Sequence, residues 1–501
     1  MTAAVFQQRV EHARQLLLNQ DFAEALSCYA NLTRKFPGQA VLWFEYGSAA
    51  SRLGQRAAAT RAWENAIALE PRNVELLLQV GHQYQGARQP EQAQACFARA
   101  AAADAKAINP RISLALLLEH QHRLAEARAV VQECLGIDAR DEQARYLSAL
   151  LDRREGLLES AEKRLRELIQ SDLRHPYVRY ACRYELAQIL DRAERFDEAM
   201  KLLGEAKQLV RALVDVEPLL KAYDHSADSA RRFASSQPAD ILQRWAKSFR
   251  SEERETIPPV ALLGGHPRSG TTLLEQVLGS HPGVVALDEP LFFAEVVGPV
   301  FRKTIEPTNA RLNVLRRSYT RALLGETGVP STAKLLLDKN PSLTAQLPVM
   351  LRVFPELRVV IALRDPRDVV LSCYFQNILL NATNANFLTF ERLAKHYADV
   401  MDIWLAVREW EGFAWLETRY EDVVADLEKE GRRATGFLGL DWHEEQKLFY
   451  ERRKQLYSPT YQDVTRPVYS ASVGRWRAYE KHLAPILPEV DSYCRKLGYA
   501  N

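Results

Sequence analysis

The stretch of sequence that decides the fold reads GGHPRSGTT and runs from Gly264 to Thr272. A short apolar segment, residues 260–263, precedes it, and a stretch of helical character, residues 273–278, follows it. In this order of strand, loop and helix, glycines let the backbone approach a phosphate closely, and the free N–H groups at the start of the helix point toward it. The stretch therefore predicts an anion-binding loop in an α/β domain.

The loop departs from the common nucleotide-binding pattern G-x-x-x-x-G-K-[ST] at one position. The spacing from Gly265 to Gly270 fits, but Thr271 stands where the pattern has its lysine. Kinases and ATPases use that lysine against the β- and γ-phosphates of a triphosphate, so the loop predicts a different phosphoanhydride ligand. Arg268 can supply the missing charge as a planar guanidinium.

Pro267 to Thr272, placed after a strand, resembles the 5'-phosphosulfate-binding loop of the sulfotransferases. Similar motifs continue in order over about residues 259–497. The resemblance implies a P-loop-like α/β sulfotransferase domain with a central parallel sheet, and 3'-phosphoadenylyl sulfate (PAPS) as the sulfate donor. The loop residues that it assigns to the donor are Arg268, Ser269, Gly270, Thr271 and Thr272.

A second motif follows the apolar segment 358–363 and resembles the family's 3'-phosphate site. Arg364 at the strand end and Ser372 eight residues later take the places of the family's arginine and serine. A guanidinium pairs with phosphate through two hydrogen bonds and a hydroxyl adds a donor. Arg367 is expected to form a local salt bridge. Gln376 departs from the family, which has another arginine near this phosphate.

Two further segments carry candidate catalytic residues. Glu289 lies in the tripeptide Asp288-Glu289-Pro290, where the resemblance to tyrosylprotein sulfotransferases is closest and implies that Glu289 takes the proton of the acceptor hydroxyl. Asp288 is the alternative as a helix cap. Lys339 follows the strand-like residues 335–338, and the resemblance implies that it stabilises charge on the leaving phosphate together with Arg268, the third catalytic candidate.

Three other positions are donor-binding candidates by resemblance. Tyr420 follows an expected strand over residues 413–417 and is a candidate for stacking or hydrogen bonding at the nucleotide, with a buried strand tyrosine as the alternative. Thr460 and Arg475 belong to a segment that resembles the family's lid over the cofactor. They replace a serine and a lysine of the tyrosylprotein enzymes, and both changes keep the hydrogen-bond donor or the charge.

The N-terminal part of the chain repeats with a period of 34 residues, the spacing of Ala25 and Ala59. The alanines in this register are Ala25, Ala59, Ala93, Ala127 and Ala161, and the rings four positions after the first three are Tyr29, Trp63 and Phe97. Two antiparallel helices approach closely only where a small residue lies at their crossing, with a ring filling the gap beside it. Each unit is therefore expected to be a helix–turn–helix.

The unit containing Trp43, Gly47, Trp63 and Pro71 matches the pattern of the tetratricopeptide repeat (TPR) family. We expect about six repeats, of which the last are degenerate, with a sixth pair near residues 180–209. The resemblance implies an α-helical solenoid that presents a groove to a protein or peptide partner. The expected organisation is a TPR domain at 1–215, a linker at 216–258 with one helix at 241–249, and the sulfotransferase domain at 259–501.

Composition and charge limit the binding partners and the cellular compartment that we expect for this protein. The 66 basic and 64 acidic residues leave a net charge of +2, so we expect neither a nucleic-acid nor a membrane partner. No apolar run approaches the roughly 18–20 residues of a membrane-spanning helix, and residues 1–19 lack the blocks of a secretion signal. The six cysteines are scattered without a C-x-x-C pair. These observations favour a cytoplasmic protein with reduced, mostly buried thiols.

The implied reaction is an in-line sulfuryl transfer to a hydroxyl acceptor, and the resemblance favours protein tyrosine as that acceptor. A carbohydrate or small-molecule acceptor is the first alternative, because the motifs concern the donor. A P-loop nucleotide kinase and a non-catalytic TPR scaffold are the others. We expect no metal, because the 11 histidines are dispersed and no cluster has metal-ligand spacing.

Overall fold

The structure is a computed structural model that describes residues 3–19, 21–248, 258–290, 292–303, 307–327, 333–377, 379–451 and 471–499. Its contacts divide the chain into two compact units. The first comprises residues 1–164 with the later segments 292–302 and 324–328, and the second comprises residues 165–291, 303–323 and 329–501. The helical N-terminal part of the chain is thus shared between the two units.

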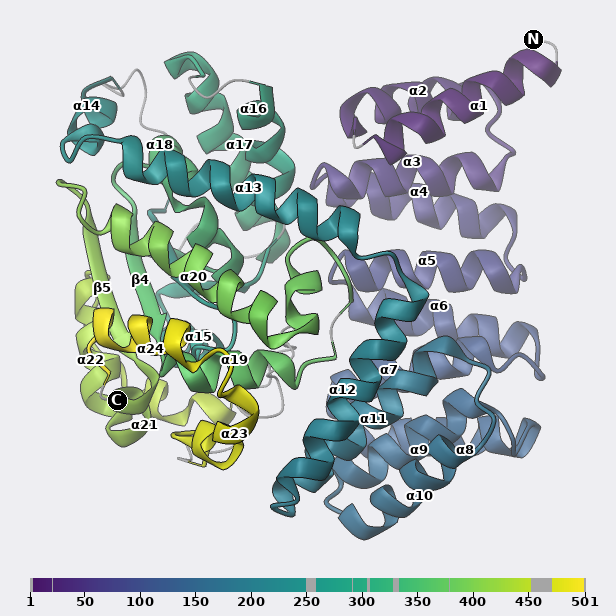
Figure 1. Ribbon diagram of the computed structural model, residues 1–501. Coiled ribbons are helices and arrows are strands. Elements are labelled where there is room, and N and C mark those ends of the chain that lie inside the picture. Colours follow the sequence, from purple (N-terminus) through teal and green to yellow (C-terminus); the bar gives the residue numbers. More distant parts are fainter. Residues whose placement is uncertain are drawn as a thin grey trace. The chain divides into compact units, whose positions relative to one another are not determined.

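Helices joined by short turns fill the described N-terminal part (Figure 1). They are α1 (Ala3–Leu18), α2 (Phe22–Lys35), α3 (Ala40–Arg52), α4 (Arg56–Leu69), α5 (Val74–Gly86), α6 (Pro90–Ala103), α7 (Asn109–His120), α8 (Leu124–Ile137), α9 (Glu142–Arg154), α10 (Leu158–Gln170), α11 (Pro176–Arg192) and α12 (Phe196–Leu213). Taken two at a time, they form the six helix–turn–helix units expected from the repeat. The last unit, α11 and α12, belongs to the second compact unit.

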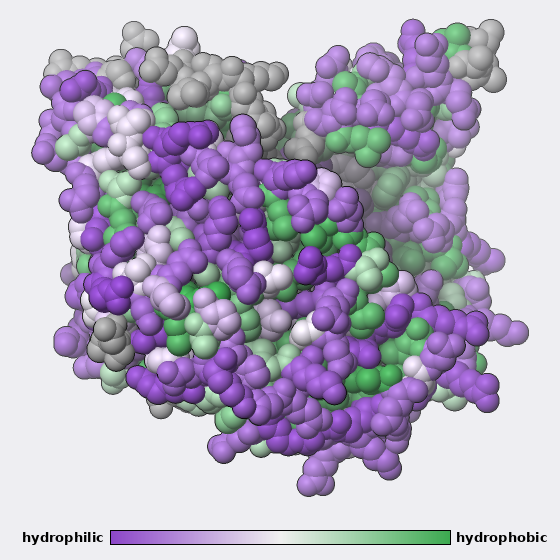
Figure 2. All heavy atoms as spheres, in the orientation of Figure 1, coloured by the Kyte–Doolittle hydropathy of each residue, from purple (hydrophilic) through white to green (hydrophobic). Residues whose placement is uncertain are grey.

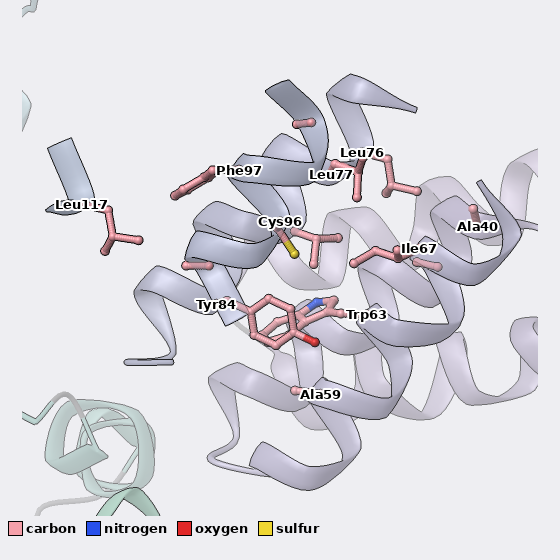
Figure 3. Packing of buried hydrophobic residues seen from close by; sticks show 14 of the residues in the cluster. Ala40, Ala59, Trp63, Ile67, Leu76, Leu77, Tyr84, Cys96, Phe97 and Leu117 are labelled. Atoms are coloured by element: carbon pink, nitrogen blue, oxygen red, sulfur yellow. The ribbon is translucent and has the colours of Figure 1, made fainter. Parts of the chain in front are cut away.

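The repeat positions form the interior of these hairpins. A Cβ at Gly47 would come within 2.4 Å of the Trp63 ring, and one at Gly81 within 2.4 Å of the Phe97 ring. Trp63 meets Tyr84 edge to face, with 4.9 Å between the ring centroids (Figure 3). The repeat alanines are also buried. The predicted arrangement, a small residue at the helix crossing with a ring beside it, is confirmed at Gly47 and Gly81.

The described part of residues 216–258 is helical. It contains α13 (Glu217–Ser236) and α14 (Ile241–Ser248), the second of which matches the expected helix. α13 packs along α20 (Phe390–Val407), where Asp224 pairs with Arg392 at 2.9 Å and Arg231 with Asp399 at 3.2 Å. The 34-residue period ends here, because α13 packs on α20 within the second unit and forms no further repeat hairpin. The domain boundaries remain a prediction.

Five parallel strands form the sheet of the second unit, in the order β2-β3-β1-β4-β5. They are β1 (Val260–Gly265), β2 (Val284–Asp288), β3 (Leu335–Lys339), β4 (Arg358–Leu363) and β5 (Ala414–Arg419). The expected central parallel sheet is confirmed, and the four predicted strands fall on β1, β3, β4 and β5. β2 was not predicted, although the apolar run 284–287 could have indicated it.

The other described α-helices lie in the C-terminal half of the chain. They are α15 (Thr271–Gly279), α16 (Gly298–Lys303), α17 (Asn309–Thr327), α18 (Leu347–Val353), α19 (Pro366–Tyr374), α21 (Tyr420–Ala425), α22 (Leu427–Phe437), α23 (Glu480–Leu483) and α24 (Leu487–Lys496). Leu274 of α15 and Ala434 of α22 share one buried cluster with Leu263, Leu337 and Val360 of the central strands. This cluster holds the helix that follows the anion loop against the sheet.

The surface in Figure 2 is mainly hydrophilic, with smaller hydrophobic areas between. None of the helices in the described ranges is both long and apolar enough to cross a membrane. The six cysteines are free and five are buried, as expected from their spacing. Burial raises the pKa of Cys373, beside the anion loop, to about 12, so this thiol is protonated.

Candidate active site

The predicted site residues lie at the carboxyl ends of the five strands. Arg268 belongs to the loop after β1, Glu289 follows β2, and Lys339 ends β3. Arg364 follows β4, and Tyr420 follows β5. Because carboxyl ends of parallel strands share one edge of a sheet, the fold brings these distant positions to one side, which is where ligands bind in open α/β sheets.

The anion loop has a backbone that requires glycine at two positions. Gly265 has φ +134° and Gly270 has φ +92°. A Cβ at Gly265 would lie 2.3 Å from the carbonyl oxygen of Ala362 in β4, and one at Gly270 would lie 2.6 Å from the Tyr420 ring. Arg268 is also left-handed, at φ +73°, a region that non-glycine residues rarely enter and that often marks functional sites.

Each backbone carbonyl from Gly265 to Arg268 accepts a hydrogen bond within the protein. The donors are the Thr344 hydroxyl to Gly265 (2.9 Å), the Ser269 hydroxyl to His266 (2.6 Å), His266 Nδ1 to Pro267 (2.8 Å) and Arg364 Nη1 to Arg268 (3.3 Å). Carbonyl oxygens repel anions, so these bonds turn the repelling groups toward the protein. The loop leads into the N-terminus of α15 (Thr271–Gly279), and the N-terminal end of a helix favours an anion.

The 3'-phosphate motif lies beside the loop. Arg268 Nε donates to the Ser372 hydroxyl at 3.1 Å, which joins the loop to α19. The Arg364 guanidinium lies 4.9 Å from the centre of the Tyr420 ring, and the residue is buried. Gln376 donates to the Ser372 carbonyl at 3.1 Å. Four residues predicted to bind the sulfate donor therefore lie together. They are Arg268 of the loop, Arg364 and Ser372 of the motif after β4, and Tyr420 after β5.

Two neighbours in this motif have structural contacts. Arg367 pairs with Asp365 at 2.8 Å, so its predicted local salt bridge is confirmed. Asp368 accepts the backbone N–H groups of Gly474 at 2.7 Å and Trp476 at 2.8 Å. Burial raises the pKa of Asp368 above its ordinary value. Asp368 was not among the predicted site residues, and its position in the motif Arg364-Asp-Pro-Arg-Asp was the available indication.

Of the two donor-binding candidates in the C-terminal segment, Thr460 and Arg475, the structure describes only Arg475. Thr460 lies outside the described residues. Arg475 pairs with Asp191 of α11, with 2.8 Å between Nη2 and Oδ1, and lies 4.3 Å from the centre of the Phe375 ring. The Tyr479 hydroxyl donates to the same Asp191 oxygen at 2.6 Å. The structure therefore joins Arg475 to the last helix hairpin and to the end of α19.

Lys339 is the most buried cation of the edge. Its side chain is 0% exposed, its Nζ lies 2.8 Å from Glu289 Oε1, and it also pairs with Asp288. Burial by itself would lower the pKa of Lys339, but the two carboxylates raise it above its ordinary value, so the lysine stays charged. The Glu289 side chain is 40% exposed and can meet an acceptor.

Asp288 ends β2 directly opposite Lys339 of β3. The alternative that Asp288 caps a helix is therefore wrong, because the residue is the last of a strand. Glu289 comes next with φ +53°, and its N–H donates to the Lys339 carbonyl at 2.7 Å. This left-handed residue ends the strand and directs the Glu289 side chain to the ammonium group. The sequence alone did not indicate that two carboxylates share one lysine.

The cations and backbone N–H groups at the carboxyl edge of the sheet can bind an anion. Arg268, Arg364 and Lys339 carry the positive charges, and the only carboxylates described in contact with Lys339 are those of Asp288 and Glu289. Across the part of the chain that the structure describes, no group of three or more His, Cys, Asp or Glu side chains could hold a metal ion. The described chemistry is that of a site for a phosphorylated or sulfated ligand.

Residues 259–444 match the sequence model of the sulfotransferase family. This span contains β1 to β5, the anion loop, the Glu289–Lys339 pair and the motif at Arg364. The chain therefore carries a sulfotransferase-family domain, and TPR-type helix hairpins precede it.

Individual relatives are distant. An uncharacterized protein of Aquifex aeolicus (strain VF5) is 25% identical over 361 residues, a match that covers 66% of this chain and 44% of that protein. The chain thus spans less than half the length of this relative. Protein-tyrosine sulfotransferase A of Caenorhabditis elegans is 22% identical over 259 residues, covering 48% of this chain and 67% of that enzyme. The solved sulfotransferase domain from the Synechococcus PCC 7002 olefin synthase is 19% identical, with a TM-score of 0.36, covering 50% of this chain and 98% of that domain.

Proposed function

We propose that this protein transfers a sulfuryl group from PAPS to a hydroxyl acceptor, and that the acceptor is a tyrosine of a protein bound by the TPR array. The observation that carries the proposal is the anion loop. Its carbonyls are bonded within the protein, and its cation is Arg268 in place of the usual lysine. The sulfotransferase family match supports the same chemistry.

The residues at the edge fit the two anionic ends of PAPS. The loop and the start of α15 would hold the 5'-phosphosulfate, and Arg364 with Ser372 would hold the 3'-phosphate, since both contact Arg268 of the loop, Arg364 through the backbone carbonyl and Ser372 through the guanidinium. PAPS supplies the sulfuryl group and leaves as 3'-phosphoadenosine 5'-phosphate (PAP). Thr460, Tyr420 and Arg475 are further donor-binding residues in this proposal.

Three side chains would serve the transfer. Glu289 accepts the proton of the acceptor hydroxyl as the new bond from oxygen to sulfur forms. Lys339 and Arg268 stabilise the negative charge that appears on the phosphate oxygen as its bond to sulfur breaks. Glu289 is half exposed while Lys339 is fully buried, an arrangement that presents the base to an incoming acceptor and keeps the cation on the donor side.

Tyrosine as acceptor rests on the likeness to protein-tyrosine sulfotransferases, one of which is 22% identical over 259 residues. A tyrosine hydroxyl has an ordinary pKa of about 10, so a positioned carboxylate assists its reaction at neutral pH. The helix hairpins offer a binding surface for the polypeptide. The cytoplasm is the proposed compartment, because all six cysteines are free.

Calorimetry with the full chain tests the donor. We expect PAP to bind at least tenfold more tightly than ATP, because a triphosphate needs the lysine that Thr271 replaces. Tighter binding of ATP would replace the sulfotransferase proposal with a nucleotide kinase, and binding of neither ligand would favour a scaffold without a donor site.

Sulfur-labelled PAPS tests the reaction and the acceptor. With a cell extract as the source of acceptors, we expect label in protein bands, released as tyrosine sulfate after digestion. Glu289→Gln should lower the labelling rate by about 10²- to 10⁴-fold, while PAP still binds. Glu409→Gln, at an exposed carboxylate of the same unit, is the matched control and should label at the normal rate. Label found only in glycans or small molecules would discard tyrosine and keep the donor assignment.

A further inference from the structure

Two buried histidines form a hydrogen-bonded pair beneath the anion loop. His266 Nε2 and His396 Nδ1 lie 2.7 Å apart, although the residues are separated by 130 positions in the chain. His266 is 1% exposed and His396 is 2% exposed. His266 belongs to the loop itself, and His396 belongs to α20. The reaction described above uses neither ring.

The hydrogen bonds assign the protons of both rings. A carbonyl oxygen can only accept, so His266 Nδ1, 2.8 Å from the Pro267 oxygen, carries a hydrogen. In a neutral ring the other nitrogen, Nε2, is then an acceptor. His396 Nδ1 must therefore donate to it. The order of donation runs from His396 through His266 to the Pro267 carbonyl, and a neutral pair allows no other order.

The surroundings keep both rings neutral. Tyr223 of α13 stacks on His396, with 5.2 Å between ring centroids, and Phe387 meets the same ring edge to face at 5.4 Å. Tyr397 lies 5.0 Å from the His266 ring. Burial lowers the pKa of His266 to about 4 and that of His396 well below its ordinary value. The assigned protons therefore persist at neutral pH.

We propose that His266 and His396 are positioning residues of the anion loop: their fixed order of donation, with a longer contact from the Cys373 thiol at 3.5 Å, holds the Pro267 carbonyl away from the bound anion. Pro267 directly precedes Arg268, whose φ of +73° depends on the orientation of the peptide between them. If that peptide turned over, the Pro267 oxygen would face the anion and the Arg268 N–H would face the protein. The inference rests on the proposed binding of PAPS at this loop.

Substitutions of His396 test the proposal, with PAP as the probe of the full chain. His396→Leu removes the donor to His266 and should weaken PAP binding about tenfold, because the loop then samples the turned peptide. His396→Asn places an amide N–H near the former Nδ1 and should restore PAP affinity to within about threefold of the parent protein. In turnover assays the KM for PAPS should follow the same order, while the KM for the acceptor stays constant.

Phe387→Leu is the control for stability, since it alters the packing on His396 without touching the hydrogen bonds. It should lower the melting temperature and leave PAP affinity within twofold of the parent protein. Equal PAP affinity in the Leu variant and the parent, or equal losses in the Leu and Asn variants, overturns the inference. Imidazole ¹⁵N shifts give a readout without ligand, and a His266 ring protonated on Nε2 overturns it as well. If the parent protein failed to bind PAP, the proposal that PAPS is the sulfate donor would be wrong, and the histidine inference would not be the cause.

Discussion

The hairpins from α3 to α6 bury almost only apolar side chains, whereas the carboxyl edge of the sheet buries charges. In the hairpins the core is made of alanines with rings such as Trp63, Tyr84 and Phe97. At the edge, Lys339 is 0% exposed and Asp288 is 1% exposed. Apolar packing stabilises a fold directly, while burying an ion pair costs desolvation that its own attraction offsets only in part. The difference indicates that the side chains buried in the hairpins stabilise the fold, whereas the charges buried at the sheet edge serve the binding site.

Trp63→Ala should give the largest effect and tests the first half of this comparison. Trp63 is fully buried, so its truncation leaves a cavity and should cost about 3–5 kcal/mol of stability. The affinity for PAP of the protein that remains folded should not change. Chemical denaturation measures the stability, and calorimetry below the transition measures the affinity. If the folded variant lost PAP binding, the hairpin interior would also shape the site, and the comparison would fail.

Lys339→Met, combined with Asp288→Asn, tests the second half. The double change removes the buried pair together, so no unpaired charge is left in the interior. We expect kcat to fall about 10²- to 10³-fold, because a fixed cation at a developing charge contributes this much in comparable sites. The melting temperature should stay close to that of the parent protein. A large drop in melting temperature with kcat preserved would mean that the pair stabilises the fold and does not serve the reaction.

Lys207 of α12 sharpens the comparison, because it places a buried charge on a repeat hairpin. It donates to the Phe387 carbonyl at 2.7 Å and lies 4.3 Å from the centre of the Tyr374 ring. Burial lowers its pKa to about 7, well below the ordinary value of about 10.4. Between these two pH values the unfolded chain binds the proton that the folded protein releases, so stability rises with pH.

Lys207→Met should therefore stabilise the protein at pH 6. That gain should shrink by up to about 1.4 kcal/mol per pH unit from pH 7 toward pH 10. Melting temperatures of the variant and the parent protein at pH 6, 8 and 9.5 measure it, with the same transition compared at each pH. A difference that did not vary with pH would show that Lys207 is charged throughout and that the hairpin accommodates a permanent cation.

Much of the fold was predictable from short-range patterns. The 34-residue period placed Ala59 and Trp63 in the interior, and apolar runs located four of the five strands. β2 was missed because its apolar run ends in Asp288, an aspartate that suggested a helix cap. α13 was missed because its pattern no longer follows the repeat.

The candidate site was predictable only where a motif carried it. Arg268, Lys339 and Arg364 were found in this way, and the structure puts them at one edge. Asp288, Asp368 and the His266–His396 pair were not, because each acts through a partner distant in the sequence. The pairing of Arg475 with Asp191 could not be predicted from the sequence either, since it joins the C-terminal segment to α11.

The sequence by itself determined the helix hairpins, the parallel strands and the residue types of the anion loop. These follow from spacing and from conformational preferences that act within a few residues of the chain. Only the tertiary structure decided which charges are buried, which carboxylates share Lys339, and which way the protons point in the histidine pair. Such choices depend on groups far apart in the chain that meet where water is excluded, and there the electrostatic interactions become strong.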